Sequence, residues 1–262
     1  MAQRRPPQTQ EAQVPCFFIF GDSLVDNGNN NGMLTLARAN YGPYGIDFPL
    51  GATGRFTNGV ENLRNAQRLI GNPQEERARA PREVLRGVNF ASGAAGIREE
   101  TGNNLKMYTM GARKVIVTSV GQIGCIPYQL ASNNSSRCNE KINDAVSMFN
   151  SGLKRLVQRF NGGTELPGAK FVYLDFYKST SDLYRNSSQY GFEVIDKGCC
   201  GVGRNNGQIT CLPLQQPCPD RRKYLFWDAF HPTELANVLL AQSSFSTQSF
   251  TYPINIQQLA MS

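Results

Sequence analysis

The feature that most constrains the fold is a long amphipathic helix between two short apolar runs. Residues 139–160 repeat apolar side chains at steps of three and four, which gives a helix one apolar face. These side chains are Ile142, Ala145, Val146, Phe149, Leu153, Leu156, Val157 and Phe160. Residues 114–120 (KVIVTSV) and 170–175 (KFVYLD) have the continuous apolar character of buried parallel strands. Strands that alternate with helices predict an α/β layered domain with a parallel sheet.

Two further strands and a last helix fit the same pattern. Residues 16–20 form an apolar run that stops at Gly21, and residues 88–91 form a shorter run. The last helix is expected at residues 235–241. Functional groups gather at the carboxyl ends of strands in such sheets. The turn around Ser23, which follows residues 16–20, is therefore a candidate site.

Length, composition and charge limit the class of protein. The chain has 262 residues, of which 40% are hydrophobic, and we expect one domain over residues 14–262 after a disordered tail at residues 1–13. The net charge of +7 invites a nucleic-acid interpretation, but the basic residues are scattered and no Lys/Arg run is interleaved with aromatic side chains. No stretch approaches the roughly 20 apolar residues of a membrane span. We therefore expect neither nucleic-acid binding nor stable membrane insertion.

Seven cysteines indicate disulfides. Cys125 and Cys138 flank a polar loop, and four others lie in a segment rich in Gly, Pro and Asn: Cys199, Cys200, Cys211 and Cys218. A zinc site is the competing interpretation, but the chain has no CxxC pair and its only histidine lies outside this segment. We expect disulfides, with their connectivity open, and a buried free thiol at Cys16.

The cysteines also bear on the compartment. Asn133, Asn134 and Asn186 each begin an N-x-S/T sequon, which fits an oxidising and glycosylating environment and hence a secreted protein. Residues 1–14 are polar and contain no apolar segment of a signal peptide. The expectation is therefore an extracellular protein whose N-terminus is alternative or incomplete.

The sole histidine is a candidate catalytic base. Histidine is the side chain whose unperturbed pKa suits a base near pH 7, so a serine-based acyl transfer in this chain has to use His231. Asp228 stands three residues earlier, where a tight turn lets its carboxylate accept the imidazole N–H and fix the tautomer. The alternative is a structural histidine that caps the following helix.

Ser23 is the candidate nucleophile. A nucleophilic serine needs an exposed hydroxyl on a rigid turn with N–H donors aimed at the developing oxyanion, and Ser23 follows a strand and Gly21. The alternative is a simple turn that begins a helix. The G-x-S-x-G elbow of α/β-hydrolases is absent.

Six sequence blocks together resemble the plant GDSL esterase/lipases of the SGNH hydrolase superfamily. They are residues 18–30 (FIFGDSLVDNGNN), 55–59 (RFTNG), 87–97 (GVNFASGAAGI), 124–127 (GCIP), 198–201 (GCCG) and 228–233 (DAFHPT). The resemblance implies a three-layer α/β/α flavodoxin-like fold. It also implies a monomer that hydrolyses small acyl or lipid esters with neither a metal nor an organic cofactor.

The same blocks imply roles for individual residues. Ser23 matches the nucleophile, and its backbone N–H matches one oxyanion donor. Gly93 matches the glycine that supplies a second donor, which suits a residue whose backbone can approach the substrate closely. Asp228 and His231 match the acid and the base.

One family block has no counterpart. The family carries Gly-x-Asn-Asp on a central strand, and its asparagine supplies a third oxyanion donor. Only residues 101–110 lie in the corresponding place, whereas a βαβ unit needs about 30 residues. We therefore expect a truncated parallel sheet with an internal deletion near residues 98–110.

This departure leaves a second function open, namely a catalytically impaired or non-catalytic extracellular protein of the same fold. Acyl transfer to an acceptor alcohol uses the same nucleophile as hydrolysis, so the sequence does not separate these two reactions. Neither acyl nor alcohol specificity can be read from the sequence, because loop shape decides both.

Overall fold

The structure is a computed structural model. It describes residues 13–61, 87–96, 108, 111–133 and 137–262. The tail expected at residues 1–13, apart from Gln13, lies outside the described residues, as does the deletion expected near residues 98–110, apart from Tyr108.

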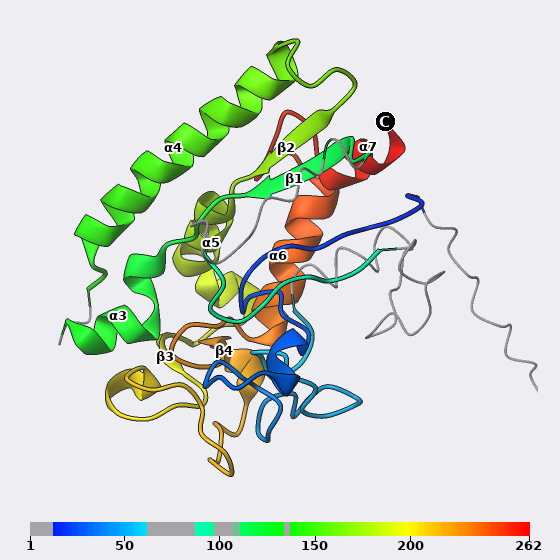
Figure 1. Ribbon diagram of the computed structural model, residues 1–262. Coiled ribbons are helices and arrows are strands. Elements are labelled where there is room, and N and C mark those ends of the chain that lie inside the picture. The colour runs from blue at the N-terminus through cyan, green and yellow to red at the C-terminus, as the bar shows by residue number, and fades with distance from the viewer. Residues whose placement is uncertain (1–12, 62–86, 97–107, 109–110, 134–136) are drawn as a thin grey trace, which may run out of the picture.

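Among the described residues, the larger sheet has three strands (Figure 1). β1 (Lys114–Thr118) and β2 (Lys170–Leu174) pair in parallel, with Lys114 opposite Lys170. β5 (Thr251–Tyr252) pairs antiparallel with β2 on its other side. The predicted strands at residues 114–120 and 170–175 are therefore confirmed, and within the part of the chain that the structure describes β1 lies at the edge of this sheet.

The predicted amphipathic helix covers one face of this sheet. It is α4 (Glu140–Gly162), and it packs against β2 (Figure 1). Val146 and Val157 of the predicted apolar face are buried, whereas Phe149 and Leu156 are exposed. The rings of Phe160 and Phe171 lie 5.1 Å apart, and Lys154 Nζ lies 5.8 Å from the ring of Tyr173. Because residues two apart on a strand share a face, these two contacts place α4 on a single face of β2.

Two C-terminal helices cover the opposite face. α6 (Glu234–Ser246) and α7 (Ile256–Met261) supply Phe245 and Ile256 to a buried cluster against which Ile116 of β1 packs. Ile116 is one residue out of step with the strand positions that face α4, so its side chain points to the other side of the sheet. The expected order of helix, sheet and helix layers is confirmed. The helix predicted at residues 235–241 is present within α6, and α7 follows it in the chain.

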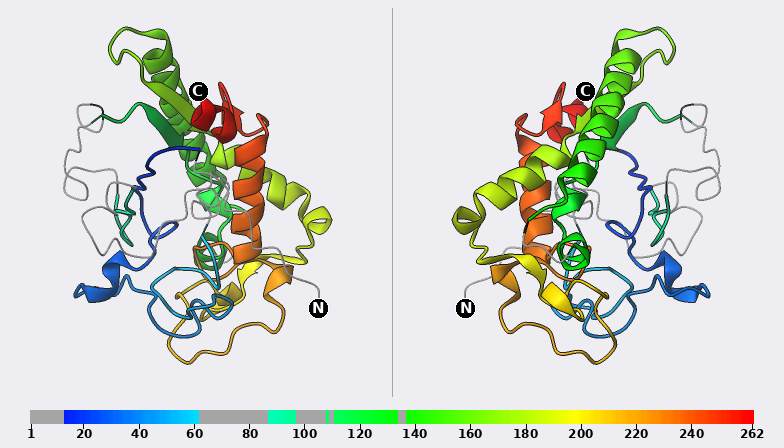
Figure 2. Two further views of the ribbon diagram at one scale, coloured as in Figure 1. Left: turned by 90° about the vertical axis from the view of Figure 1, so that its right-hand side faces the viewer. Right: turned by 90° about the vertical axis from the view of Figure 1, so that its left-hand side faces the viewer.

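A second, smaller sheet precedes the C-terminal helices in the chain. β3 (Val194–Gly198) pairs in parallel with β4 (Tyr224–Phe226), and residues 227–232 connect β4 to the segment before α6. α5 (Phe176–Arg185) packs with α6 in one buried cluster, on the side of the molecule away from residues 13–33 (Figure 2). The remaining short helices are η1 (Asn29–Gly32), η3 (Ile123–Cys125), α3 (Pro127–Ser132), η4 (Ser187–Tyr190), η5 (Arg204–Asn206) and η6 (Arg221–Lys223). None of the helices within the described ranges is both long and apolar enough to cross a membrane.

The N-terminal run does not form the expected buried strand. Residues 16–20 make one isolated parallel bridge, between Ile19 and Asn89, in place of a ladder. Ile19 is buried, but Phe18 and Phe20 are 44% and 40% exposed and stack on Phe90. The physical reason is a missing neighbour: among the described residues this segment pairs on one side only, so nothing holds it extended within a sheet.

The cysteines form three disulfides, as expected. The pairs are Cys125–Cys138, Cys199–Cys218 and Cys200–Cys211. No group of three metal-binding side chains lies within the part of the chain that the structure describes. Cys16 is free, but it is partly exposed and not buried as the sequence suggested.

Candidate active site

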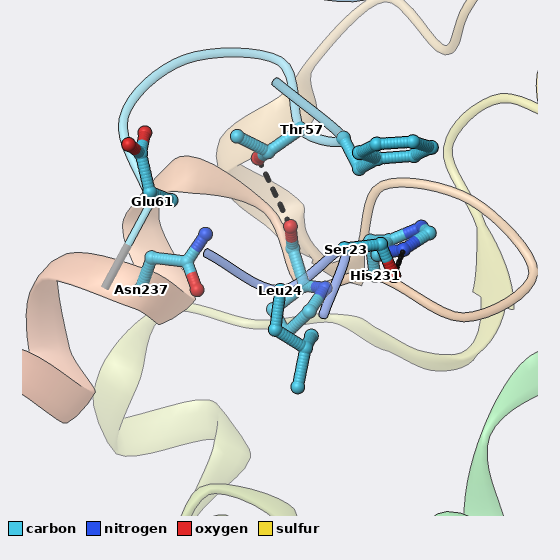
Figure 3. A pocket seen from close by; sticks show the side chains of 8 residues that line it. Ser23, Leu24, Thr57, Glu61, His231 and Asn237 are labelled. Atoms are coloured by element: carbon cyan, nitrogen blue, oxygen red, sulfur yellow. Dashed lines mark hydrogen bonds between the residues drawn. The ribbon is translucent and has the colours of Figure 1, made fainter. Parts of the chain in front are cut away.

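The three predicted catalytic side chains meet in one place. Ser23 Oγ lies 2.8 Å from His231 Nε2, although 208 residues separate the two positions in the chain (Figure 3). His231 Nδ1 lies 2.8 Å from Asp228 Oδ1 and 3.0 Å from Oδ2. The hydroxyl, the imidazole and the carboxylate therefore form a continuous hydrogen-bonded relay.

A tight turn presents Ser23. The Val25 N–H donates to the carbonyl of Asp22, and the Leu24 N–H donates to the Asp22 carboxylate. A Cβ atom on Gly21 would lie only 2.6 Å from Val25 Cγ2, so a glycine lets the chain enter this turn. The residue order Gly, Asp, Ser thus has a local structural cause.

The Asp228 side chain closes the turn that carries His231. Its Oδ1 atom accepts the N–H groups of Phe230 and His231, each at 2.9 Å, and it is fully buried. Trp227 N–H donates to the carbonyl of His231 at 2.7 Å, which fixes the same turn from the backbone side. Burial alone raises the pKa of the Asp228 carboxyl. The charge of His231 and the hydrogen bonds from His231, Tyr44 and Phe230 outweigh it and hold that pKa below its usual value.

Aromatic rings fix the imidazole and the carboxylate from the sides. The Phe56 ring lies 5.1 Å from the ring of His231. Tyr44 Oη donates to Asp228 Oδ2 at 2.6 Å, from a loop 184 residues earlier in the chain. The sequence reasoning did not identify Tyr44. The only available signal was an aromatic pair, Tyr41 and Tyr44, in a loop rich in Gly and Pro.

The two predicted oxyanion donors differ in their surroundings. The Ser23 N–H has no acceptor within the described residues. The Gly93 N–H donates to Asp26 Oδ2 at 2.8 Å, while Asp26 Oδ1 accepts the N–H groups of Gly28 and Asn29. In this structure, therefore, the Gly93 N–H is bound within the protein. Its role as an oxyanion donor stays a prediction.

Asparagine side chains join the Ser23 segment to residues 87–96. Asn29 Nδ2 donates to the carbonyls of Asn89 and Ala91, and Asn89 Nδ2 donates to the carbonyl of Val25. These amide hydrogen bonds join the two segments as backbone hydrogen bonds join regular strands. Asparagine side chains in residues 26–31 thus have a structural role.

A small hollow adjoins the nucleophile (Figure 3). It holds about 190 Å³ of empty space, part of it open to solvent. Its walls are formed by Ser23, Leu24, Phe56, Thr57, Glu61, His231, Pro232 and Asn237.

Known proteins resemble the chain over nearly its whole length. A family model for GDSL-like Lipase/Acylhydrolase matches residues 99–243, which include Asp228 and His231. The chain is 51% identical to GDSL esterase/lipase At1g33811 of Arabidopsis thaliana, with 96% of this chain and 92% of the relative covered. It is 42% identical to GDSL esterase/lipase At4g18970 of the same plant (94% and 92% covered) and 37% identical to At1g71691 (96% and 87% covered).

These alignments are longer than the chain. They extend over 343, 338 and 336 positions, whereas the chain has 262 residues. The relatives therefore carry residues that have no counterpart here.

Proposed function

Because this chain belongs to the family of GDSL esterase/lipases, which hydrolyse esters, we propose that Ser23, His231 and Asp228 carry out its reaction. The observation that supports this assignment is the closed relay from Ser23 Oγ through His231 to Asp228, with 2.8 Å at each step. Parts of the chain 208 residues apart have no local reason to bring the only imidazole to this hydroxyl.

The geometry supports a two-step acyl transfer. His231 Nε2 takes the proton from Ser23 Oγ as the oxygen attacks the ester carbonyl carbon, and Asp228 stabilises the imidazolium that forms. The imidazolium returns the proton to the departing alcohol, which leaves the acyl group on Ser23. Water, activated by the same imidazole, then releases the acid and restores the serine.

The oxyanion donors set the expected rate. The Ser23 N–H is available, whereas the Gly93 N–H has to leave Asp26 before it can contact an oxyanion. Each donor absent from the transition state lowers turnover by about 10²–10³-fold. We therefore expect slow hydrolysis compared with a hydrolase whose donors are all in place.

The alternative of a non-catalytic protein is not favoured, because the relatives are esterase/lipases and the relay is assembled. A short p-nitrophenyl ester and a fluorophosphonate probe test the choice. We expect both ester turnover and labelling in the natural protein, and neither in Ser23→Ala. Labelling that persists unchanged in Ser23→Ala would show that another residue is the nucleophile.

We also propose that the enzyme acts outside the cell as a monomer on small acyl esters. Three disulfides and the exposed side chain of Asn133, which begins a sequon, support an oxidising, glycosylating compartment. Light scattering during size exclusion measures the mass directly. A mass of one chain, 29.0 kDa before any glycan, is expected.

We further propose that residues 14–262 form one domain from which a segment near residues 98–110 has been lost. The alignments to the relatives, which are longer than the chain, support a loss within the chain. The edge position of β1 agrees with a strand lost from its open side.

A further inference from the structure

The buried carboxylate of Asp228 has an uneven set of partners. Oδ1 accepts two backbone N–H groups, from Phe230 and His231, and lies 2.8 Å from His231 Nδ1. Among the described residues, Oδ2 has two partners, the more distant contact to Nδ1 at 3.0 Å and the Tyr44 hydroxyl at 2.6 Å. In the described part of the chain, the Tyr44 hydroxyl is therefore the one group outside the turn that fixes the second oxygen.

Tyr44 itself cannot swing away. Its side chain is 2% exposed, and its ring lies edge-on to those of Tyr41, Phe56 and Trp227 at 5.4, 6.1 and 6.1 Å. Burial and then the negative charge of Asp228 raise the pKa of the Tyr44 hydroxyl far above its usual value. The hydroxyl therefore stays protonated and donates to the carboxylate at any pH at which the protein works.

We propose that Tyr44 is a positioning residue of this hydrolase, which acts through Asp228 and not on the substrate. Its hydroxyl holds the carboxylate in the plane where both oxygens face His231 Nδ1. It also takes up part of the negative charge, and so moderates the pull of the carboxylate on the imidazole proton. This role rests on the proposed function of Ser23, His231 and Asp228.

Few other titratable groups act on this carboxylate. Within the described residues, the titratable groups that interact with Asp228 are Tyr41 and Tyr44, from a loop near the N-terminus, and His231, from its own turn. The nearby Cys199 and Cys200 are held in disulfides and do not titrate. A change in the hydrogen bond between His231 and Asp228 after removal of one tyrosine hydroxyl can therefore be assigned to that hydroxyl.

Tyr41 offers a matched control. It lies three residues from Tyr44 in the same aromatic cluster, and its hydroxyl donates to a group other than Asp228, the carbonyl of Cys211, at 2.9 Å. Tyr41→Phe and Tyr44→Phe each remove one oxygen atom from this cluster. We expect kcat to fall about tenfold in Tyr44→Phe and to change less than twofold in Tyr41→Phe, with KM unchanged in both.

The sole histidine allows a measurement that does not need turnover. The imidazole of His231 gives a single histidine resonance in the NMR spectrum, because the chain has no other histidine. Without the tyrosine hydroxyl, the carboxylate pulls more strongly on the imidazole proton. We therefore expect the Nδ1–H proton of His231, which lies on the hydrogen bond to Asp228, to resonate further downfield in Tyr44→Phe than in the natural protein and in Tyr41→Phe.

The two proposals fail in different ways. Unchanged ester turnover and labelling in Ser23→Ala would overturn the proposed function. Equal Nδ1–H resonances and equal kcat in Tyr41→Phe and Tyr44→Phe would overturn the role of Tyr44 alone. If Tyr44→Phe does not fold, the hydroxyl proton of Tyr44 in the natural protein provides the test. It should resonate well downfield of an exposed tyrosine hydroxyl, because it is held by the carboxylate of Asp228, and a hydroxyl proton at the position of an exposed tyrosine contradicts the proposal.

Discussion

At the residue scale, the site depends on one buried carboxylate that is surrounded by donors. Two backbone N–H groups, an imidazole and a phenol converge on Asp228, which has no exposed surface. An unpaired buried charge is costly, whereas a carboxylate with four donors is stabilised in its ionised form. The residue that orients His231 is thereby also part of what stabilises the fold.

This dual role predicts a pH effect. The folded state holds the pKa of Asp228 below its ordinary value of 3.8. Such a group stabilises the fold above the pKa of the unfolded state, and the stabilisation is lost as the pH falls through the folded-state pKa. We expect Asp228→Asn to lower Tm by a constant amount between about pH 5 and 7, and the gap to shrink below about pH 4.

Circular dichroism melts from about pH 3 to 7 measure this gap. Asp144→Asn, at an exposed position of α4, is the control and should melt like the natural protein at each pH. A gap that widens on acidification would contradict the assignment.

At the element scale, β1 has one partner strand among the described residues. The Lys170 N–H donates to the carbonyl of Arg113, and the Ser119 N–H donates to the carbonyl of Leu174, so odd-numbered positions face β2. Backbone groups alternate between the two edges of a strand. Those of Ile116 therefore face the open edge, where no acceptor lies among the described residues.

Hydrogen exchange tests this edge. We expect the amide of Ile116 to exchange at least about tenfold faster than those of Val115 and Val117, which face β2. Amide-resolved NMR exchange at pH 6–7 measures the difference, and the amides of β2 serve as the protected reference. Equal protection along β1 would mean that a partner covers its outer edge.

The disulfide segment is a second element with a role in the site. The N–H groups of Cys199 and Cys200 donate to the carbonyls of Phe226 and Trp227, directly before Asp228. The Cys200–Cys211 bond therefore stabilises the segment that delivers the carboxylate. Trp227 is fully buried against the same cysteines and Tyr44.

Removal of that bond should affect both stability and activity. Cys200→Ser with Cys211→Ser should lower the free energy of unfolding by about 2–4 kcal/mol and reduce kcat. The control removes Cys125–Cys138, which closes a loop of similar length, 13 residues against 11. It should lower stability by a similar amount, as measured by urea denaturation, with a smaller loss of kcat. Equal losses of kcat in the two variants would show that the Cys200–Cys211 bond has no specific effect on the active site.

At the scale of the whole molecule, the sheet is split. β1 and β2 form one part, and the Ile19–Asn89 bridge forms another that is not joined to them within the described residues. Exposed Phe18, Phe20 and Phe90 mark the face that a continuous sheet would cover with helices. We expect this arrangement to lower stability and to loosen the position of Ser23 against His231.

A chimera tests that expectation. The residues of the 51%-identical relative that have no counterpart here can be inserted at residues 101–110. We expect Tm to rise by several degrees and kcat by about 10²-fold, because the segment that we propose to be lost would carry the central strand and the oxyanion donor that the family resemblance implies. A flexible Gly/Ser insert of equal length is the control and should raise neither Tm nor kcat. A chimera that melts and reacts like the control would rule out the lost segment as the cause.

The sequence predicted those parts of the protein that neighbouring residues specify. The pattern of apolar residues within each segment predicts the helix at residues 139–160 and the strands at 114–120 and 170–175, and the structure agrees with these predictions. Residues 16–20 have the same apolar character, yet they do not form a strand ladder. A strand also needs neighbours, and their number is not encoded in the run itself.

What the sequence determined by itself is the chemistry available: one imidazole, a carboxylate three residues before it, a serine after a glycine, and cysteines that pair. What only the tertiary structure decided is which groups meet. The contacts of Ser23 with His231 and of Tyr44 with Asp228 span 208 and 184 residues. Residues so far apart in the chain come together only through the packing of the helices and sheets that lie between them. Spacing along the chain, by contrast, positions only groups that are a few residues apart.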